Sequence, residues 1–390
     1  MKVQTNNRIH GLDILRSAAI ILVFMYHYMV FVSKQATFGF LSDIGWVGVD
    51  LFFVLSGYLI GHQILSPIAN QHKFSFRIFY SRRLLRTLPN YLFILSIYFL
   101  IPSFREATTL PPLWKFITFT QNFGLRSGTA FSHSWSLCIE EQFYLLLPLL
   151  ALVISYKKSI RIGWVILAGL LISGIILRGS IWIYYTEYAS NLLYNYNTKI
   201  YYSSFCRLDE LLLGVAIAML RNFHKDAWNK VIKKGNFIFL FGIIGSGVTF
   251  YMFLDNHYGF FMTTFGYTLL AISFASLTLA ALSPNCYILN VKIPGAATLA
   301  TWSYAIYLIH KPLSVVVYSV LSKWEISASG LLAILIIVFA SLICGALLHL
   351  CIETPFLRLR DKIGKMSLDS QPTEIPKNII QDTKIGLIRD

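Results

Sequence analysis

The chain has 390 residues, of which 56% are hydrophobic and only 13% are charged, against about 25% charged residues in an average soluble domain. This composition excludes an ordinary soluble protein, because most of the chain cannot face water. The formal charge of +15 is carried by short basic blocks between apolar runs. Since no long basic tract occurs, we expect no nucleic-acid partner.

Ten stretches of the sequence come near the length of about 20 apolar residues that a membrane-spanning helix needs. The first of them follows the polar residues 1–10 and is long enough to span, which predicts an uncleaved first helix and not a signal peptide. We therefore predict an all-α, polytopic transmembrane helical bundle of about ten spans. The spans are expected near 12–32, 46–65, 87–102, 136–155, 161–179, 206–221, 236–253, 260–281, 299–321 and 329–352.

Basic residues gather in alternate connections between these segments, and such connections belong on the cytoplasmic side. The opposite connections carry fewer bases, so ten spans with both termini in the cytoplasm satisfy the pattern. The basic blocks are Lys2 and Arg8; Lys73, Arg77, Arg82, Arg83 and Arg86; Lys157, Lys158 and Arg161; Arg221, Lys225, Lys230, Lys233 and Lys234; and Arg358, Arg360, Lys362 and Lys365.

Two regions are too polar to span. Apolar residues recur among the bases of 66–86 as in a helix lying at the membrane interface. The residues after Glu353 are polar as well, so we expect a membrane domain over 1–355 and a polar cytoplasmic tail over 356–390.

The first predicted helix contains three ionisable residues, Asp13, Arg16 and His27, and such groups at membrane depth indicate function by default. From Arg16 to His27 the helix turns about 1100°, within about 20° of three full turns, and rises about 16.5 Å. Both side chains should face one groove, over roughly the reach of the pantetheine arm of coenzyme A. The alternative is that Arg16 extends to the inner headgroups and His27 only makes a hydrogen bond within the bundle.

Three carboxylates at similar predicted depth, Asp50, Glu140 and Glu141, could converge on His27. A carboxylate that accepts a hydrogen bond from one imidazole nitrogen leaves the other nitrogen free as a general base. The catalytic candidates are therefore His27, Asp50 and Glu141.

Other polar residues offer binding roles. Arg207 and Asp209, with Glu210, start the sixth predicted helix, either as a neutralised ion pair or as an acceptor-binding site. His310, another substrate-binding candidate, and Lys311 lie midway along the ninth helix and are the main rivals of His27.

Near the cytoplasm, Arg83 and Arg86 share a helix face and, with Arg16, could bind the phosphates of a nucleotide-bearing donor, although lipid headgroups would serve equally. No Gly-x-Ser-x-Gly turn is present, which disfavours a covalent serine enzyme. The five cysteines lie in or beside apolar runs without metal or disulfide spacing, so no metal is expected.

Six motifs follow one another along the chain: Gly11 to Arg16 continuing to His27, Gly48 to Ile60, Tyr80 to Pro89, His133 to Tyr144, Ser303 to Pro312, and Glu353 to Pro355. Each motif is weak alone, but their joint order over about residues 8–360 resembles the acyltransferase 3 family of membrane O-acyltransferases.

The resemblance implies an O-acyltransferase with ten core helices in a bacterial cytoplasmic membrane, using acetyl coenzyme A or a similar acyl-CoA as donor substrate and no tightly bound cofactor. The family's Arg-x10-His motif falls on Arg16 and His27, the second being the expected catalytic residue, and its Arg-x-x-Arg motif falls on Arg83 and Arg86. Many relatives carry a further helix and a periplasmic hydrolase-like domain, and we expect this chain to act on its acceptor without them.

The expected acceptor is a sugar of lipopolysaccharide O-antigen or of another surface polysaccharide, and lipid contacts follow from the spans. One alternative is acylation of a small secondary metabolite such as a macrolide. The other is a secondary transporter, but the inverted repeats and paired broken helices that transporters often show are not found.

Overall fold

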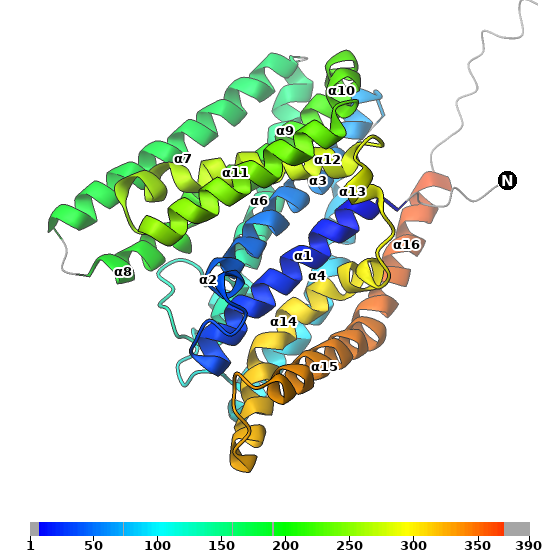
Figure 1. Ribbon diagram of the computed structural model, residues 1–390. Helices are drawn as coiled ribbons and strands as arrows, with labels where there is room; N and C mark the ends of the chain where they lie inside the picture. The colour runs from blue at the N-terminus through cyan, green and yellow to red at the C-terminus, as the bar shows by residue number, and fades with distance from the viewer. Residues whose placement is uncertain (1–7, 73, 158, 189–190, 370–390) are drawn as a thin grey trace, which may run out of the picture.

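The computed structural model describes residues 8–72, 74–157, 159–188 and 191–369, and this part of the chain is helical throughout, without strands (Figure 1). The predicted all-α class is confirmed, and each of the ten predicted segments coincides with one long helix. These helices are α1 (His10–Tyr28), α3 (Gly48–Ala69), α4 (Phe76–Leu100), α6 (Trp135–Lys157), α7 (Ile160–Tyr188), α9 (Asp209–Phe223), α11 (Gly235–Asn256), α12 (Tyr267–Leu282), α14 (Ala296–Leu321) and α15 (Leu331–Leu348).

Shorter elements connect the long helices. Four of them are π-helical. Three continue or precede a long helix, namely Met29–Ser33 after α1, Met262–Gly266 before α12 and His349–Glu353 after α15, and Tyr196–Tyr201 follows the short helix at Leu192–Asn195. The short α-helices are α2 (Phe40–Ile44), α5 (Leu113–Ile117), α8 (Leu192–Asn195), α10 (Lys225–Ile232) and α13 (Tyr287–Asn290), and the helix α16 (Thr354–Asp369) follows α15 and its π-helical extension.

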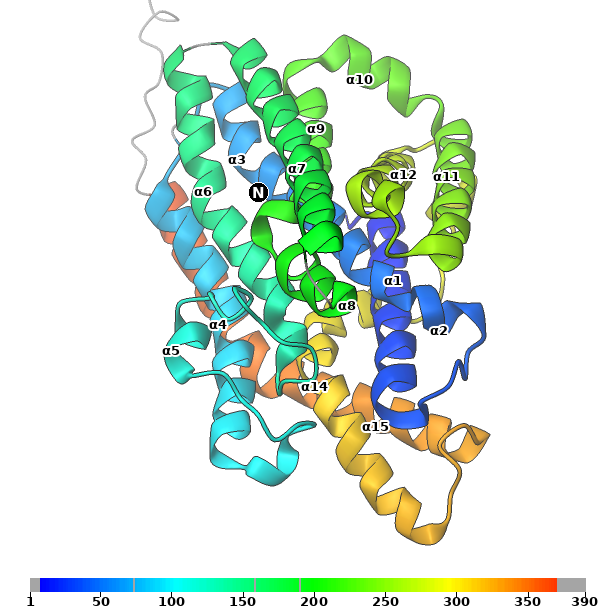
Figure 2. The same cartoon turned by 90° about the vertical axis from the view of Figure 1, so that its left-hand side faces the viewer.

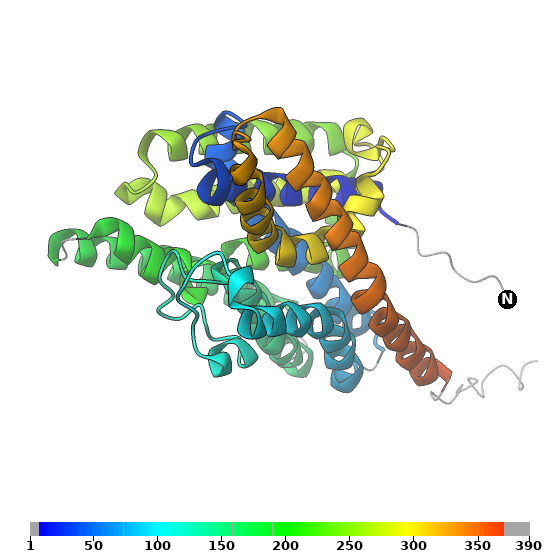
Figure 3. The ribbon, with the colours of Figure 1, turned by 90° about the horizontal axis from the view of Figure 1, so that it is seen from below.

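Seven helical stretches in the described residues are long and apolar enough to cross a membrane, so the chain is a multi-pass membrane protein. The helices α4, α6 and α9 are outside this set, and α9 has only 15 residues. The count of ten spans and the side of the two termini remain predictions. The start of α1 and the end of α16 lie at the same end of the bundle (Figures 1 and 3).

Residues 66–86 do not form one helix of their own, so this part of the prediction is wrong, and their place at the membrane interface stays a prediction. The helix α3 runs on to Ala69, and residues 76–86 form the first turns of α4, which continues without a break to Leu100. Ser75 caps this helix, because its side chain accepts a hydrogen bond from the backbone N–H of Ile78. The arginines of this region are therefore held on a long rigid helix.

The predicted polar tail starts with a helix. Residues of the predicted tail form α16, which packs against α4. Residues 370–390, together with Lys2, Lys73 and Lys158, lie outside the described part of the chain.

The helix α3 forms the centre of the bundle, with 83% of its most apolar window buried, and packs against α1, α6, α9 and α12. Its crossing with α9 is the closest, because a Cβ added at Gly57 would collide with the carbonyl of Leu211, and one at Gly214 with the carbonyl of Val54. Small residues at such crossings let two helices approach in an apolar medium. By contrast α7 and α11 lie on the periphery (Figures 1 and 2), and only 17% and 22% of their most apolar windows are buried.

Candidate active site

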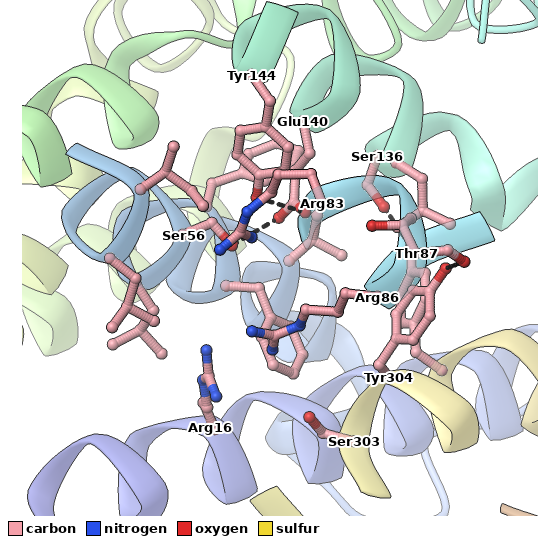
Figure 4. Close-up of a pocket in the computed structure, with 18 residues that line it drawn as sticks. Arg16, Ser56, Arg83, Arg86, Thr87, Ser136, Glu140, Tyr144, Ser303 and Tyr304 are labelled. Carbon is pink, nitrogen blue, oxygen red and sulfur yellow. Dashed lines mark hydrogen bonds between the residues drawn. The ribbon is translucent and has the colours of Figure 1, made fainter. Parts of the chain in front are cut away.

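Two cavities lie along the axis of α1. The first, which we call the arginine cavity, has a volume of about 110 Å³ and contains Arg16 of α1 together with Arg83 and Arg86 of α4 (Figure 4). The second, the histidine cavity, has a volume of about 230 Å³ and contains His27, His133 and Lys311. It is otherwise walled largely by aromatic rings, namely Tyr26, Phe31, Trp46, Trp135, Tyr196, Tyr201, Tyr202, His257 and Tyr258.

The arginine cavity holds three guanidinium groups, which gather around one space (Figure 4). Glu140 is the carboxylate among its lining residues, and its two oxygens accept hydrogen bonds from Ser56 at 2.9 Å and Tyr144 at 3.0 Å. Arg83 donates to Gln63 at 2.9 Å, while its Nε finds no acceptor among the described residues although it is buried. Positive charge is in excess here, as an anion-binding site requires.

A hydrogen-bonded partition separates the two cavities. The hydroxyl of Tyr307 donates to the carbonyl of His133 at 2.6 Å and is 2.6 Å from the hydroxyl of Ser136. Ser136 and Tyr307 line the arginine cavity, whereas His133 lines the histidine cavity. The first turn of α6 and one ring from α14 therefore form the wall.

The prediction of a single groove from Arg16 to His27 is therefore wrong, because Arg16 lines the arginine cavity and His27 lines the histidine cavity. The helical spacing does align the two side chains along α1, but Ile20 and Val23 between them are buried in helix packing. Periodicity on one helix gives the direction of a side chain, and it does not say what a neighbouring helix places in front of it.

His27 is hydrogen-bonded to another histidine, not to a carboxylate: its Nδ1 lies 2.7 Å from Nε2 of His310. The Nδ1 of His310 in turn faces the carbonyl oxygens of Ile306 and Tyr307, at 2.9 and 3.0 Å. Carbonyl oxygens only accept, so His310 carries its proton on Nδ1 and accepts through Nε2. The proton of a neutral His27 is then on Nδ1, and its Nε2 is the free base.

His133 is oriented by a second carbonyl. Pro312 has no N–H to donate to the carbonyl of Leu308, four residues earlier on α14, and Nε2 of His133 takes this position at 3.2 Å. The Nδ1 of His133 is buried without a partner in the described residues. Burial, with the Lys311 ammonium and His310 nearby, lowers the pKa of His133 well below its ordinary value, so the ring is neutral at pH 7.

Lys311 forms an ion pair with Glu106 in the loop after α4, with 2.9 Å between Nζ and Oε1. It also donates to the hydroxyl of Ser132 at 2.8 Å. Glu106 was not predicted as a site residue, because it lies in a loop between two predicted spans and not at membrane depth. No group of three or more His, Cys, Asp and Glu side chains that could hold a metal ion occurs among the described residues.

The structure places Asp50 away from His27. Asp50 forms a fully buried ion pair with Arg207, whose guanidinium lies over the rings of Tyr267 and Tyr201 at 4.0 and 4.9 Å. Glu141 lies beside Glu140 and Arg83, on the arginine side of the partition. Neither carboxylate therefore orients His27 as the sequence had suggested.

Asp209 is likewise closed off. It accepts two hydrogen bonds from Arg178 at 2.9 and 2.8 Å, and both side chains are buried. Arg207 and Asp209 are thus each neutralised in an ion pair, but with Asp50 and Arg178 and not with each other. Of the three binding candidates, His310 is the one that contacts His27. The partner Arg178 was not identified from the sequence, although an arginine inside the predicted span 161–179 is a signal that could have found it.

Comparison with known proteins gives one family. A family model described as an acyltransferase domain, of the acyltransferase 3 type, matches residues 9–350. The putative peptidoglycan O-acetyltransferase YrhL of Bacillus subtilis is 30% identical over 343 residues, covering 80% of this chain and 50% of that protein. The O-acetyltransferase OatA of Staphylococcus aureus is 27% identical over 340 residues, covering 82% and 52%.

The chain thus spans about half the length of these curated relatives. A putative O-acetyltransferase of S. aureus strain COL is 27% identical over 398 residues, which cover 95% of this chain and 60% of that protein. No solved structure matches the chain.

Replacing Asp50 by Asn should lower the yield and melting temperature of the folded protein, because it leaves the Arg207 cation buried without its counter-charge at a cost of about 3–5 kcal/mol. His27→Ala should leave both unchanged and abolish activity. The two variants are compared by size-exclusion profile and thermal unfolding in detergent. If the Asp50→Asn protein were as stable as the wild type but inactive, Asp50 would have a catalytic role and not only a structural one.

His310→Leu removes the acceptor for Nδ1–H of His27, so the free-base tautomer is no longer favoured, and we expect kcat to fall about a hundredfold or more. His310→Gln offers an amide oxygen at a similar reach and should recover part of that loss. Equal rates for the two variants would show that the hydrogen bond does not set the tautomer.

Proposed function

Because this chain belongs to the acyltransferase 3 family, we propose that it transfers an acyl group, acetyl in the simplest case, from a cytoplasmic acyl-CoA to a hydroxyl of a cell-surface glycan. The protein would lie in the bacterial cytoplasmic membrane. The observation that carries the proposal is the pairing of a cation-rich cavity with a histidine cavity on one helix.

The arginine cavity suits the donor. Coenzyme A carries several phosphate charges, and Arg16, Arg83 and Arg86 offer planar guanidinium donors that match phosphate geometry. The basic blocks of the sequence put the start of α4 on the cytoplasmic side, where acyl-CoA is made. The unpaired Nε of Arg83 is a donor ready for such a ligand.

The histidine cavity suits a sugar. Its rings can stack on the apolar face of a pyranose, while its hydroxyl, amide and imidazole groups can form hydrogen bonds with the sugar hydroxyls. The relative YrhL is named as a putative peptidoglycan O-acetyltransferase, which favours a peptidoglycan sugar as acceptor. An O-antigen sugar remains the other prediction.

The reaction needs one base. His27 Nε2 removes the proton of the acceptor hydroxyl as its oxygen attacks the thioester carbonyl. The C–S bond then breaks, and the coenzyme A thiolate takes the proton back from the His27 imidazolium. For this the thioester must cross the wall made by Tyr307 and Ser136, so we infer that this wall opens during turnover.

Proteoliposomes with labelled acetyl coenzyme A on one side and peptidoglycan or O-antigen fragments on the other test the proposal. We expect label on the glycan with wild-type protein and none with His27→Ala. Glycan movement without thioester consumption would instead support the transporter alternative.

Arg83→Ala should raise KM for acetyl coenzyme A about tenfold or more, because a charge-assisted hydrogen bond to phosphate contributes about 1.5–3 kcal/mol. Arg82→Ala is the matched control, since Arg82 precedes Arg83 but is not among the residues that line the cavity. Equal shifts in KM would mean that these arginines act on the membrane surface and not on the donor.

Tyr307→Ala should open the partition and admit water to the thioester, so acetyl coenzyme A hydrolysis without acceptor should rise while transfer to glycan falls. Tyr304→Ala enlarges the same arginine cavity without touching the wall. If both variants changed hydrolysis equally, the wall would not control access.

A further inference from the structure

Lys311 is a buried cation on the wall of the histidine cavity. Its side chain is only 1% exposed and lies in the middle of α14, where an ammonium group is costly unless it is paired. It lines the same cavity as His27 and lies over the ring of Phe31 at 4.1 Å. A structural ion pair does not need to face the reaction space, so the position of Lys311 calls for an explanation.

The loop after α4 supplies the carboxylate that pairs with this ammonium group. Glu106 is fully buried, accepts hydrogen bonds from the backbone N–H of Phe131 at 2.9 Å and from the hydroxyl of Tyr98 at 2.7 Å, and pairs with Lys311. Three donors thus surround the carboxyl group of Glu106. Its negative charge in turn stabilises the ammonium.

One N–H group of the Lys311 ammonium has no oxygen or nitrogen acceptor among the described residues. An ammonium has three N–H groups, and within the described residues the acceptors are the carboxylate of Glu106 and the hydroxyl of Ser132. The Arg207 cation near the cavity is already neutralised, because it forms an ion pair with Asp50. The rings of His133 and His257 are neutral at pH 7, because burial lowers the pKa of His133 and, with the Arg207 charge, brings that of His257 to about 4.

Attack of a hydroxyl on a thioester places negative charge on the carbonyl oxygen, and enzymes stabilise this oxyanion with preorganised donors. We propose that Lys311 is this donor: a catalytic residue whose free N–H stabilises the oxyanion that forms beside His27. The inference rests on the proposed function. The C–O bond forms as the carbonyl π electrons move to oxygen, and the oxyanion collapses as the C–S bond breaks, while Lys311 keeps its protons throughout.

The test neutralises the pair as a unit. Lys311→Met alone leaves Glu106 charged and buried, and such a protein could simply fail to fold. The double variant Glu106→Gln with Lys311→Met removes both charges, and the amide oxygen of the glutamine can still accept from the N–H of Phe131 while its NH2 group donates to the hydroxyl of Tyr98. We expect it to match the wild type in yield and KM for acetyl coenzyme A, with kcat lower by about a hundredfold or more.

A second readout separates chemistry from structure. In a dithioester analogue of acetyl coenzyme A, sulfur replaces the carbonyl oxygen and accepts hydrogen bonds poorly. The wild type should prefer the oxygen donor strongly, and the double variant should lose most of that preference. The control, Asp209→Asn with Arg178→Met, neutralises a buried pair outside the cavity and should keep the preference of the wild type.

The outcomes are distinct. If the wild type consumes no acyl-CoA, the proposed function fails and the role of Lys311 fails with it. If the wild type is active and the double variant keeps its kcat or its preference for the oxygen donor, the role of Lys311 alone is overturned.

Discussion

The ion pair between Asp50 and Arg207 joins α3 to the start of α9 in a part of the bundle where neither charge has water to solvate it. The same constraint accounts for Asp209 with Arg178 and for Glu106 with Lys311. Buried charges in an apolar environment are kept only when they are paired and hydrogen-bonded. Groups that depart from this rule are therefore informative, and two of them, Arg83 and His133, each have a buried nitrogen without a partner among the described residues and line the two cavities.

In the arginine cavity the departure is an excess of cations over carboxylates. In the histidine cavity it is smaller and consists of one free N–H on Lys311 and free lone pairs on His27 and His133. The first arrangement suits a stable anion such as a phosphate, whereas the second suits charge that exists only during a reaction. Under the proposed function, the side chains of Tyr307 and Ser136 would separate the site that binds the charged donor from the site of the chemistry.

Much of the fold could be predicted from the sequence, because hydropathy and helical period report directly on burial. The all-α class and the resemblance to the acyltransferase 3 family are confirmed. The partners of the site residues could not be predicted. Period places Arg16 and His27 on one face of α1, but the contact of His27 with His310 depends on how α14 packs against it. Glu106 could not be predicted, because the sequence of a loop that folds back into the bundle has the same polar composition as that of an exposed connection.

The histidine pair and Pro312 show how one helix can set the chemistry of its neighbours. Proline frees the carbonyl of Leu308, which orients His133, and the carbonyls of Ile306 and Tyr307 orient His310. Tyr307 closes the partition, and Lys311 faces the cavity two turns or less from all of them. A shift of α14 relative to α1 and α6 would therefore change the wall, the tautomer of His27 and the position of the ammonium together. Under the proposed function, the movement that opens the wall for the thioester would therefore be coupled to the positions of the catalytic groups.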